Sequence, residues 1–123
     1  MNSKVFMVIR IIFALALLFF GANKLFHFMD PPPSPEESMG YWTALMATKT
    51  IKVVALVEIV SGLTLLLNKY AALMMIILMS VSVNAILYHI AMDPDAIGMA
   101  VGLIILNIVM LYGYKDKYKE LFN

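Results

Sequence analysis

Residues 70–92, YAALMMIILMSVSVNAILYHIAM, carry no formal charge except the one that His89 can take. An α-helix needs about 20 mostly apolar residues to cross the roughly 30 Å of hydrocarbon in a bilayer. This stretch has that length and that character. It predicts a transmembrane helix, and with it a membrane fold.

Three further apolar blocks of similar length lie along the chain: Val5 to Gly21, interrupted by Arg10; Ile51 to Leu67, interrupted by Glu58; and Ala96 to Tyr114, with no charge. Asn68 and Lys69 join two blocks so tightly that their helices must be antiparallel. We therefore predict an all-α membrane protein: an antiparallel bundle of four transmembrane helices at about residues 5–27, 50–67, 70–92 and 96–114. We expect residues 1–123 to form a single integral membrane domain.

The composition excludes several classes of protein. Hydrophobic residues make up 63% of the chain and charged residues 14%, whereas soluble domains contain roughly 45–50% and roughly 25%. The chain lacks the polar residues that a small soluble domain needs for its surface. A net charge of +1 without a strongly basic stretch offers nucleic acid no binding surface. Because there is no cysteine, disulfides, zinc-thiolate sites and iron–sulfur clusters are excluded.

The first link, residues 28–49, is the one long connection, and it begins with the stiff run Asp30-Pro31-Pro32-Pro33. Ser34, Pro35 and Glu37 then have the spacing of an N-cap, a proline at the first helical position and a capping-box glutamate. They predict a short amphipathic helix from about Pro35 to Ala47. Its larger side chains are of kinds that partition to a membrane surface: Met39, Tyr41, Trp42, Leu45 and Met46.

The distribution of Lys and Arg predicts the orientation, because cytoplasmic segments hold the excess. An even number of spans places both termini and the 68–69 turn on one side of the membrane. That side would hold Lys4, Arg10, Lys69, Lys115, Lys117 and Lys119, against Lys24, Lys49 and Lys52 on the other. We therefore expect both termini, and a tail at residues 115–123, to be cytoplasmic, with the first link extracytoplasmic.

Glu58 lies near the middle of the second apolar block, where a charge costs roughly 2.5–3.5 kcal/mol. It shares a helix face with Ala55 and Gly62, small residues that let another helix come close. A similar stripe of small residues and cations follows the first block: Arg10, Ala14, Gly21 and Lys24. We therefore expect the first and second predicted spans to pack together.

Packing of these two faces would bring Glu58 near a cation, which lowers the desolvation cost that either charge bears alone. We expect Lys24 to be that cation rather than Arg10, because Arg10 is close enough to the cytoplasmic surface to snorkel. Two interpretations remain open. The pair is a structural ion pair, or Glu58 exchanges protons or contacts a ligand in an outward-open cavity.

Further polar side chains lie in the outer half of the same bundle. Asn84 and His89 belong to the third span, and with Lys24 and Glu58 they form our candidate ligand-binding set. Two histidines, His27 and His89, raise the question of haem, but nothing in their spacing specifies a porphyrin cleft. We assign no metal site, because Glu58 lies too deep to join the histidines.

The fourth predicted span carries one amide, Asn107, for which an interhelical hydrogen bond is the default interpretation. Gly98 and Gly102 form a small-xxx-small pair on a different side of that helix. This pair would close a helix contact inside the bundle or a dimer interface. No phosphate loop, nucleophile elbow, dinucleotide fingerprint or zinc-protease motif is present, so the spacing of residues defines no reaction.

Four motifs follow one another along the chain: Gly21 to Phe28 (GANKLFHF), Val57 to Leu63 (VEIVSGL), Asn84 with Tyr88, His89, Asp93 and Pro94, and Tyr112 to Asp116 (YGYKD). In order and spacing they resemble the DoxX family of small bacterial membrane proteins. The resemblance implies a bacterial cytoplasmic membrane and a redox setting, because the family is named after a subunit associated with a terminal quinol oxidase or a thiosulfate:quinone oxidoreductase. By this resemblance, Lys24, Glu58 and His89 correspond to recurring polar positions of the family. The resemblance does not imply any catalytic residue in this chain.

Three functions remain open. The first is an accessory or quinone-associated subunit of a membrane redox system, in which other subunits carry the redox centre and Glu58 exchanges the proton of a quinone. The second is a transporter or binding protein for a small solute or lipid. The third is a structural assembly partner, acting with other redox subunits or as a homo-oligomer. Quinone is the cofactor we consider; catalysis would be at most that of a subunit in a quinone-linked oxidoreductase.

Overall fold

The structure, a computed structural model, describes residues 2–27 and 35–122. Within these ranges there are helices and turns but no strand, so the all-α prediction is confirmed. The elements are α1 (Ser3–Phe26), α2 (Glu36–Ala47), α3 (Thr50–Leu67), α4 (Ala71–Met92), the 3-10 segment η1 (Pro94–Ala96), α5 (Gly98–Gly113) and the 3-10 segment η2 (Lys115–Phe122).

Three of these helices, α1, α3 and α4, are long and apolar enough to cross a bilayer. The shorter α5 has 16 residues, and it passes the same test together with η2, which is bent from it by 76°. The described residues therefore contain three candidate spans, or up to four if the bent pair is one span. The chain is a multi-pass membrane protein, and the fourth span stays a prediction.

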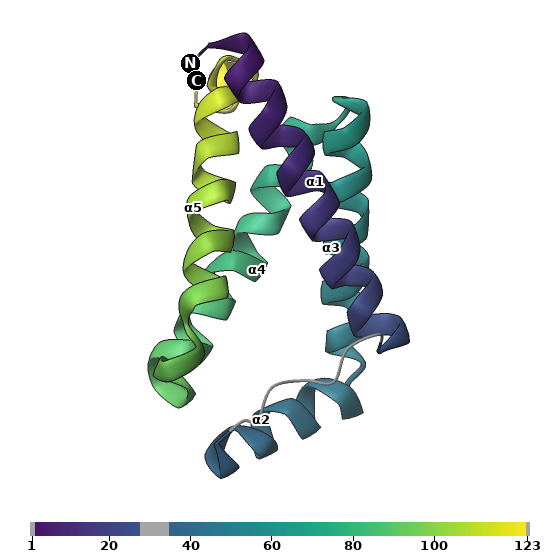
Figure 1. Ribbon diagram of the computed structural model, residues 1–123, viewed down its shortest axis with the longest axis vertical. Helices are drawn as coiled ribbons and strands as arrows, with labels where there is room; N and C mark the ends of the chain where they lie inside the picture. Colours follow the sequence, from purple (N-terminus) through teal and green to yellow (C-terminus); the bar gives the residue numbers. More distant parts are fainter. Residues whose placement is uncertain (1, 28–34, 123) are drawn as a thin grey trace.

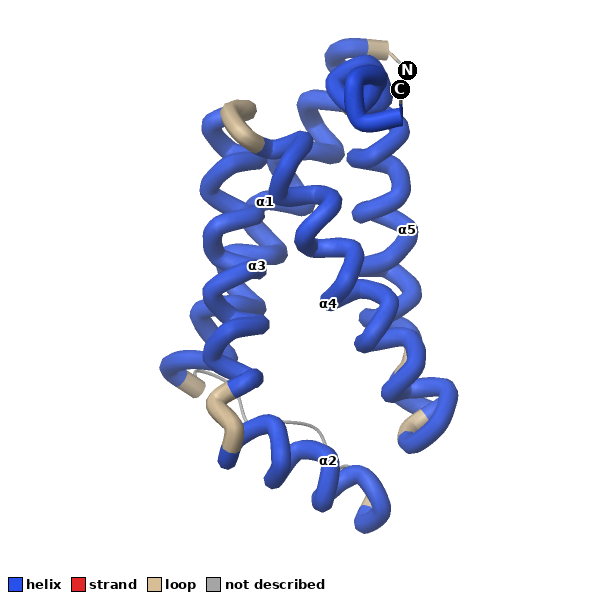
Figure 2. The backbone as a smooth tube through the Cα atoms, turned by 180° about the vertical axis from the view of Figure 1, so that it is seen from behind, coloured by secondary structure: helices blue, strands red, loops and turns tan. Residues whose placement is uncertain are grey.

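The long helices form two pairs that diverge from one end of the molecule (Figure 1). α1 packs along α3, and α5 packs along α4. The start of α1, the end of η2 and the α3–α4 turn lie at one end, which we call the terminal end (Figure 1). The opposite end, which we call the α2 end, holds α2 and the α4–α5 connection, and Figure 2 shows the same arrangement from behind.

Arg10 ties α1 to α3 near the terminal end. Its guanidinium donates to the carbonyl oxygens of Leu65 and Leu66. The last carbonyl groups of a helix have no hydrogen-bond donor within the helix, and hydrocarbon offers none. Arg10 therefore supplies the donors that these carbonyl groups lack. The largest apolar side chains that are fully buried lie between the helices: Phe13, Leu17, Leu65, Met75, Leu78 and Met110.

Two tyrosines at the end of α5 and in η2 hold the terminal end closed. The Tyr114 hydroxyl donates to Asn68 Oδ1 at 2.6 Å, in the turn between α3 and α4. The Tyr118 hydroxyl donates to the Ala72 carbonyl oxygen at 2.7 Å, near the start of α4. Phe6 of α1 packs edge-on against Tyr114, with ring centroids 5.2 Å apart. All four long helices are therefore joined at this end.

Asn107 links α5 to α4, as expected. It accepts a hydrogen bond from Ser82 Oγ at 2.7 Å and donates one to the Met75 carbonyl oxygen at 3.0 Å. The glycine pair on the same helix does not close a contact. A Cβ added to Gly98 or Gly102 would meet no atom within 4 Å among the residues that the structure places.

The helix of the first link is confirmed at about its expected bounds, but Pro35 is not its first helical residue. Pro35 is the residue before the helix, and it has an extended ψ of 147° rather than a helical one. Its carbonyl oxygen accepts from the Ser38 hydroxyl at 2.7 Å and from the Ser38 backbone N–H at 3.0 Å. The expected N-cap Ser34 and the proline run before it lie outside the described residues.

Candidate functional site

A cavity of about 740 Å³ lies between the diverging helix pairs. It is lined by residues from all five α-helices, and its walls are mostly aliphatic and aromatic. All four residues of the candidate set, Lys24, Glu58, Asn84 and His89, line it. The volume falls within the roughly 300–1,000 Å³ typical of sites for small molecules.

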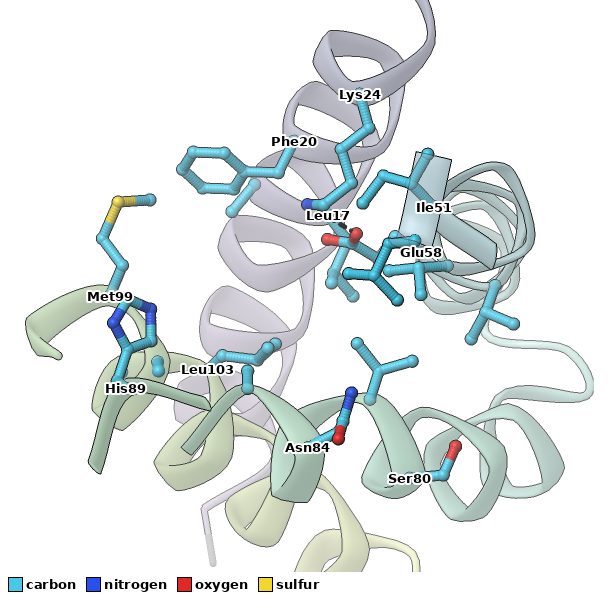
Figure 3. A pocket seen from close by; sticks show the side chains of 18 of the residues that line it. Leu17, Phe20, Lys24, Ile51, Glu58, Ser80, Asn84, His89, Met99 and Leu103 are labelled. Atoms are coloured by element: carbon cyan, nitrogen blue, oxygen red, sulfur yellow. Dashed lines mark ion pairs between the residues drawn. The ribbon is translucent and has the colours of Figure 1, made fainter. Parts of the chain in front are cut away.

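One wall of the cavity carries an ion pair. The Lys24 ammonium lies 2.7 Å from Glu58 Oε1, and the two side chains are 29% and 5% exposed. The expected pairing of Glu58 with Lys24 is confirmed, while Arg10 bonds to backbone carbonyls elsewhere. Figure 3 shows the two side chains reaching toward each other at the cavity from α1 and α3.

Close contact between α1 and α3 makes this ion pair possible. A Cβ on Gly21 of α1 would lie 3.0 Å from the Ala55 carbonyl oxygen of α3. Reciprocally, a Cβ on Gly62 of α3 would lie 2.9 Å from the Ala14 carbonyl oxygen of α1. Each glycine thus faces the backbone of the other helix, as the two small-residue stripes predicted. A Cβ on Gly21 would also lie 3.2 Å from the Cβ of Glu58, so α1 packs closely against the base of the Glu58 side chain.

Asn84 and His89 lie on the facing wall, which belongs to α4 (Figure 3). Asn84 Nδ2 donates to the Tyr41 hydroxyl at 3.0 Å, which leaves its carbonyl oxygen as an acceptor. His89 Nδ1 lies 3.1 Å from the Asp93 carbonyl oxygen. Because a carbonyl oxygen can only accept, His89 Nδ1 carries a proton and donates it in this hydrogen bond, and Nε2 is the ring nitrogen left for a ligand.

Two aromatic residues of α2 line the α2 end of the cavity, and the sequence analysis did not include them in the site. The Trp42 indole N–H donates to the Tyr88 hydroxyl at 2.9 Å. The Tyr41 ring lies 4.9 Å from the Tyr88 ring and 6.0 Å from the Trp42 ring, between centroids. The sequence contains part of the information that would add these residues to the site, because Asn84 and Tyr88 share a helix face and Tyr41 and Trp42 are neighbours in the chain. Without the packing of α2 on the bundle, nothing connected the two pairs.

The arrangement offers both donors and acceptors to a molecule in the cavity. Lys24 is a cationic donor, Glu58 is a carboxylate, and the Asn84 oxygen and His89 Nε2 face them from α4. Among the described residues there is no group of three or more His, Asp or Glu that could hold a metal ion. Because polar groups lie on two facing walls and the rest of the lining is apolar, the cavity suits an organic molecule with polar groups on two sides and apolar faces between them.

Comparison with known proteins gives one match. The family model described as DoxX matches residues 5–91, which include all four candidate residues. No curated protein and no solved structure matches the chain.

Proposed function

The chain belongs to the DoxX family, and we propose that this membrane protein is a quinone-associated subunit of a membrane redox system. It would hold the head group of a quinone between α1 and α3 on one side and α4 on the other. The electrons would come from a redox centre in another subunit. The observation that supports this proposal is the placement of polar groups on two facing walls of an otherwise apolar cavity.

A quinone ring has a carbonyl oxygen at each of two opposite positions and apolar faces between them. The Lys24 ammonium can donate to one oxygen. On the facing wall, the hydrogen bond to Tyr41 uses one N–H of the Asn84 amide, and the second N–H can donate to the other oxygen. Reduction to the quinol takes up two electrons and two protons, so a titratable group beside an oxygen is useful. Glu58, held at the cavity by Lys24, is the group to which we assign proton exchange.

We place the protein in the bacterial cytoplasmic membrane with both termini in the cytoplasm. The terminal end supports this orientation, because α1 begins there and η2, with its three lysines, ends there. The cavity would then be in the outer half of the membrane, with α2 on its extracytoplasmic side.

The single tryptophan of the chain supplies a direct binding assay, because Trp42 lines the cavity. Quinones quench indole fluorescence at short range. In the purified protein, a short-tailed quinone should quench Trp42 emission with saturation, and it should raise the temperature of thermal unfolding. A matched control moves the tryptophan to an exposed position on the same helix, in the double variant Trp42→Phe, Met39→Trp. In that variant the saturable quenching should disappear.

Glu58→Gln tests the assignment of the carboxylate. It keeps the shape of the side chain and removes its charge, so the concentration for half-quenching should rise about tenfold. Quenching that is linear with concentration and equal in both tryptophan positions reflects collision and overturns the proposal. Stabilisation by phospholipid or another amphiphile, with none by quinone, would favour the transporter or lipid-binding alternative instead.

A further inference from the structure

The cavity is covered at both ends of the bundle. At the α2 end, Tyr41 and Trp42 line it and are hydrogen-bonded to Asn84 and Tyr88. Toward the terminal end, α1 and α5 meet, and a Cβ on Gly113 would collide with the ring of Phe6. These contacts obstruct entry along the bundle axis at each end.

On the side between α1 and α5, residues that line the cavity are also exposed, and we call this place the opening between α1 and α5. Away from Phe6 the two helices diverge toward the α2 end (Figure 1, Figure 2). Phe20 of α1 and Met99 and Gly102 of α5 line the cavity at this opening. Met99 is 64% exposed, and Gly102 is exposed with open space where its side chain would be. Met99 and Gly102 thus face both the cavity and the surroundings of the protein.

A second side opening lies between α3 and α4, and its chemistry differs. Three exposed residues of these helices line the cavity there: Val53, Ser80 and Asn84. Two of the three are polar. The Ser80 hydroxyl keeps its hydrogen bond to the Ile77 carbonyl oxygen, but a hydrocarbon chain that passed over Asn84 would shield the second N–H and the carbonyl oxygen of its amide from hydrogen-bonding partners, which is unfavourable. The opening between α1 and α5 has no such cost, since its lining residues are aromatic, thioether and glycine.

We propose that the ligand is a molecule with a long isoprenoid or alkyl tail that enters from the bilayer between α1 and α5, with its tail crossing Gly102. This inference rests on the proposed function and names its substrate class: a membrane-dissolved quinone rather than a water-soluble one. Gly102 determines the specificity for a tailed quinone, because a glycine has no side chain and the tail lies in the space that a side chain would fill. The head group reaches Lys24 and Glu58 while the tail stays among lipid chains.

The test uses two quinones with one head group, one without a tail and one with a long isoprenoid tail. Binding is measured by Trp42 quenching in phosphatidylcholine nanodiscs. Gly102→Leu should weaken the tailed quinone about tenfold, because the leucine takes the place of a few methylene groups of the tail. It should leave the tailless quinone unchanged. Gly98→Leu is the matched control: it makes the same change one turn away, also in open space, at a residue that does not line the cavity.

Further variants separate the outcomes. Gly102→Ala should give a smaller effect in the same direction, and it serves if the leucine variant does not fold. Val53→Phe obstructs the other opening without adding a second tryptophan, and it should leave the ratio of the two quinone affinities unchanged. If the tailless quinone binds and the tailed one is selectively weakened by Val53→Phe but not by Gly102→Leu, this entry route is refuted while the proposed function stands. If the unmodified protein binds neither quinone, the proposed function fails, and the inference fails with it.

Discussion

Replacement of the Lys24–Glu58 pair by apolar residues separates its structural role from a role in binding. Glu58 is 5% exposed, so Lys24→Met leaves a buried carboxylate without its cation and should lower the free energy of unfolding by about 3–5 kcal/mol. Glu58→Gln leaves Lys24, which is 29% exposed and partly solvated, so its cost should be smaller, about 1–2 kcal/mol. The two single variants should therefore differ.

The double variant Lys24→Met, Glu58→Leu removes both charges and fills the space with side chains of similar volume. Its stability should return to within about 1 kcal/mol of the unmodified protein, because no charge is left unpaired. It should no longer show saturable quenching of Trp42 by quinone. Unfolding is followed by circular dichroism during titration of detergent micelles with dodecyl sulfate. Equal costs for the two single variants, or a double variant less stable than Lys24→Met, would refute the reasoning.

Three further predictions concern the parts of the fold that position the site. Gly62→Ala should lower the free energy of unfolding by about 1–3 kcal/mol in the same titration, because its Cβ would lie 2.9 Å from the Ala14 carbonyl oxygen. The control variant Gly98→Ala places its Cβ in open space and should not lower the free energy of unfolding. Asn107→Leu should cost about 1–2 kcal/mol, since it leaves Ser82 Oγ and the Met75 carbonyl oxygen without their partner; combination with Ser82→Ala should restore part of that loss. Burial raises the pKa of Tyr118 from 10.0 to about 12, so its contribution to stability should be complete below pH 10 and should be lost as the pH rises through 12. The pH dependence of unfolding is measured for the unmodified protein and for Tyr118→Phe. The variant should lack this part of the loss of stability at high pH.

Much of the fold follows from local sequence. The lengths of the apolar blocks predicted where α1, α3 and α4 lie, because crossing hydrocarbon needs a continuous apolar helix. Periodicity placed Ala55, Glu58 and Gly62 on one helix face, and the structure packs that face against α1. The bounds of α2 were predicted, but Pro35 precedes the helix instead of beginning it, because a proline is compatible with either position and the backbone ψ decides between them.

The tertiary structure alone decided which distant groups meet. Periodicity gives the direction of a side chain from its own helix, but the distance to another helix depends on how the two are packed. Arg10 and Lys24 lie on one stripe of α1, and the position of the end of α3 assigned Arg10 to the carbonyls of Leu65 and Leu66 and left Lys24 for Glu58. In the same way, the position of α2 across the open end of the bundle brought Tyr41 and Trp42 to the cavity. The sequence by itself determined the helices and their polar faces. The cavity that those faces line exists because the two helix pairs diverge, and this divergence is a property of how the helices pack and not of any one segment.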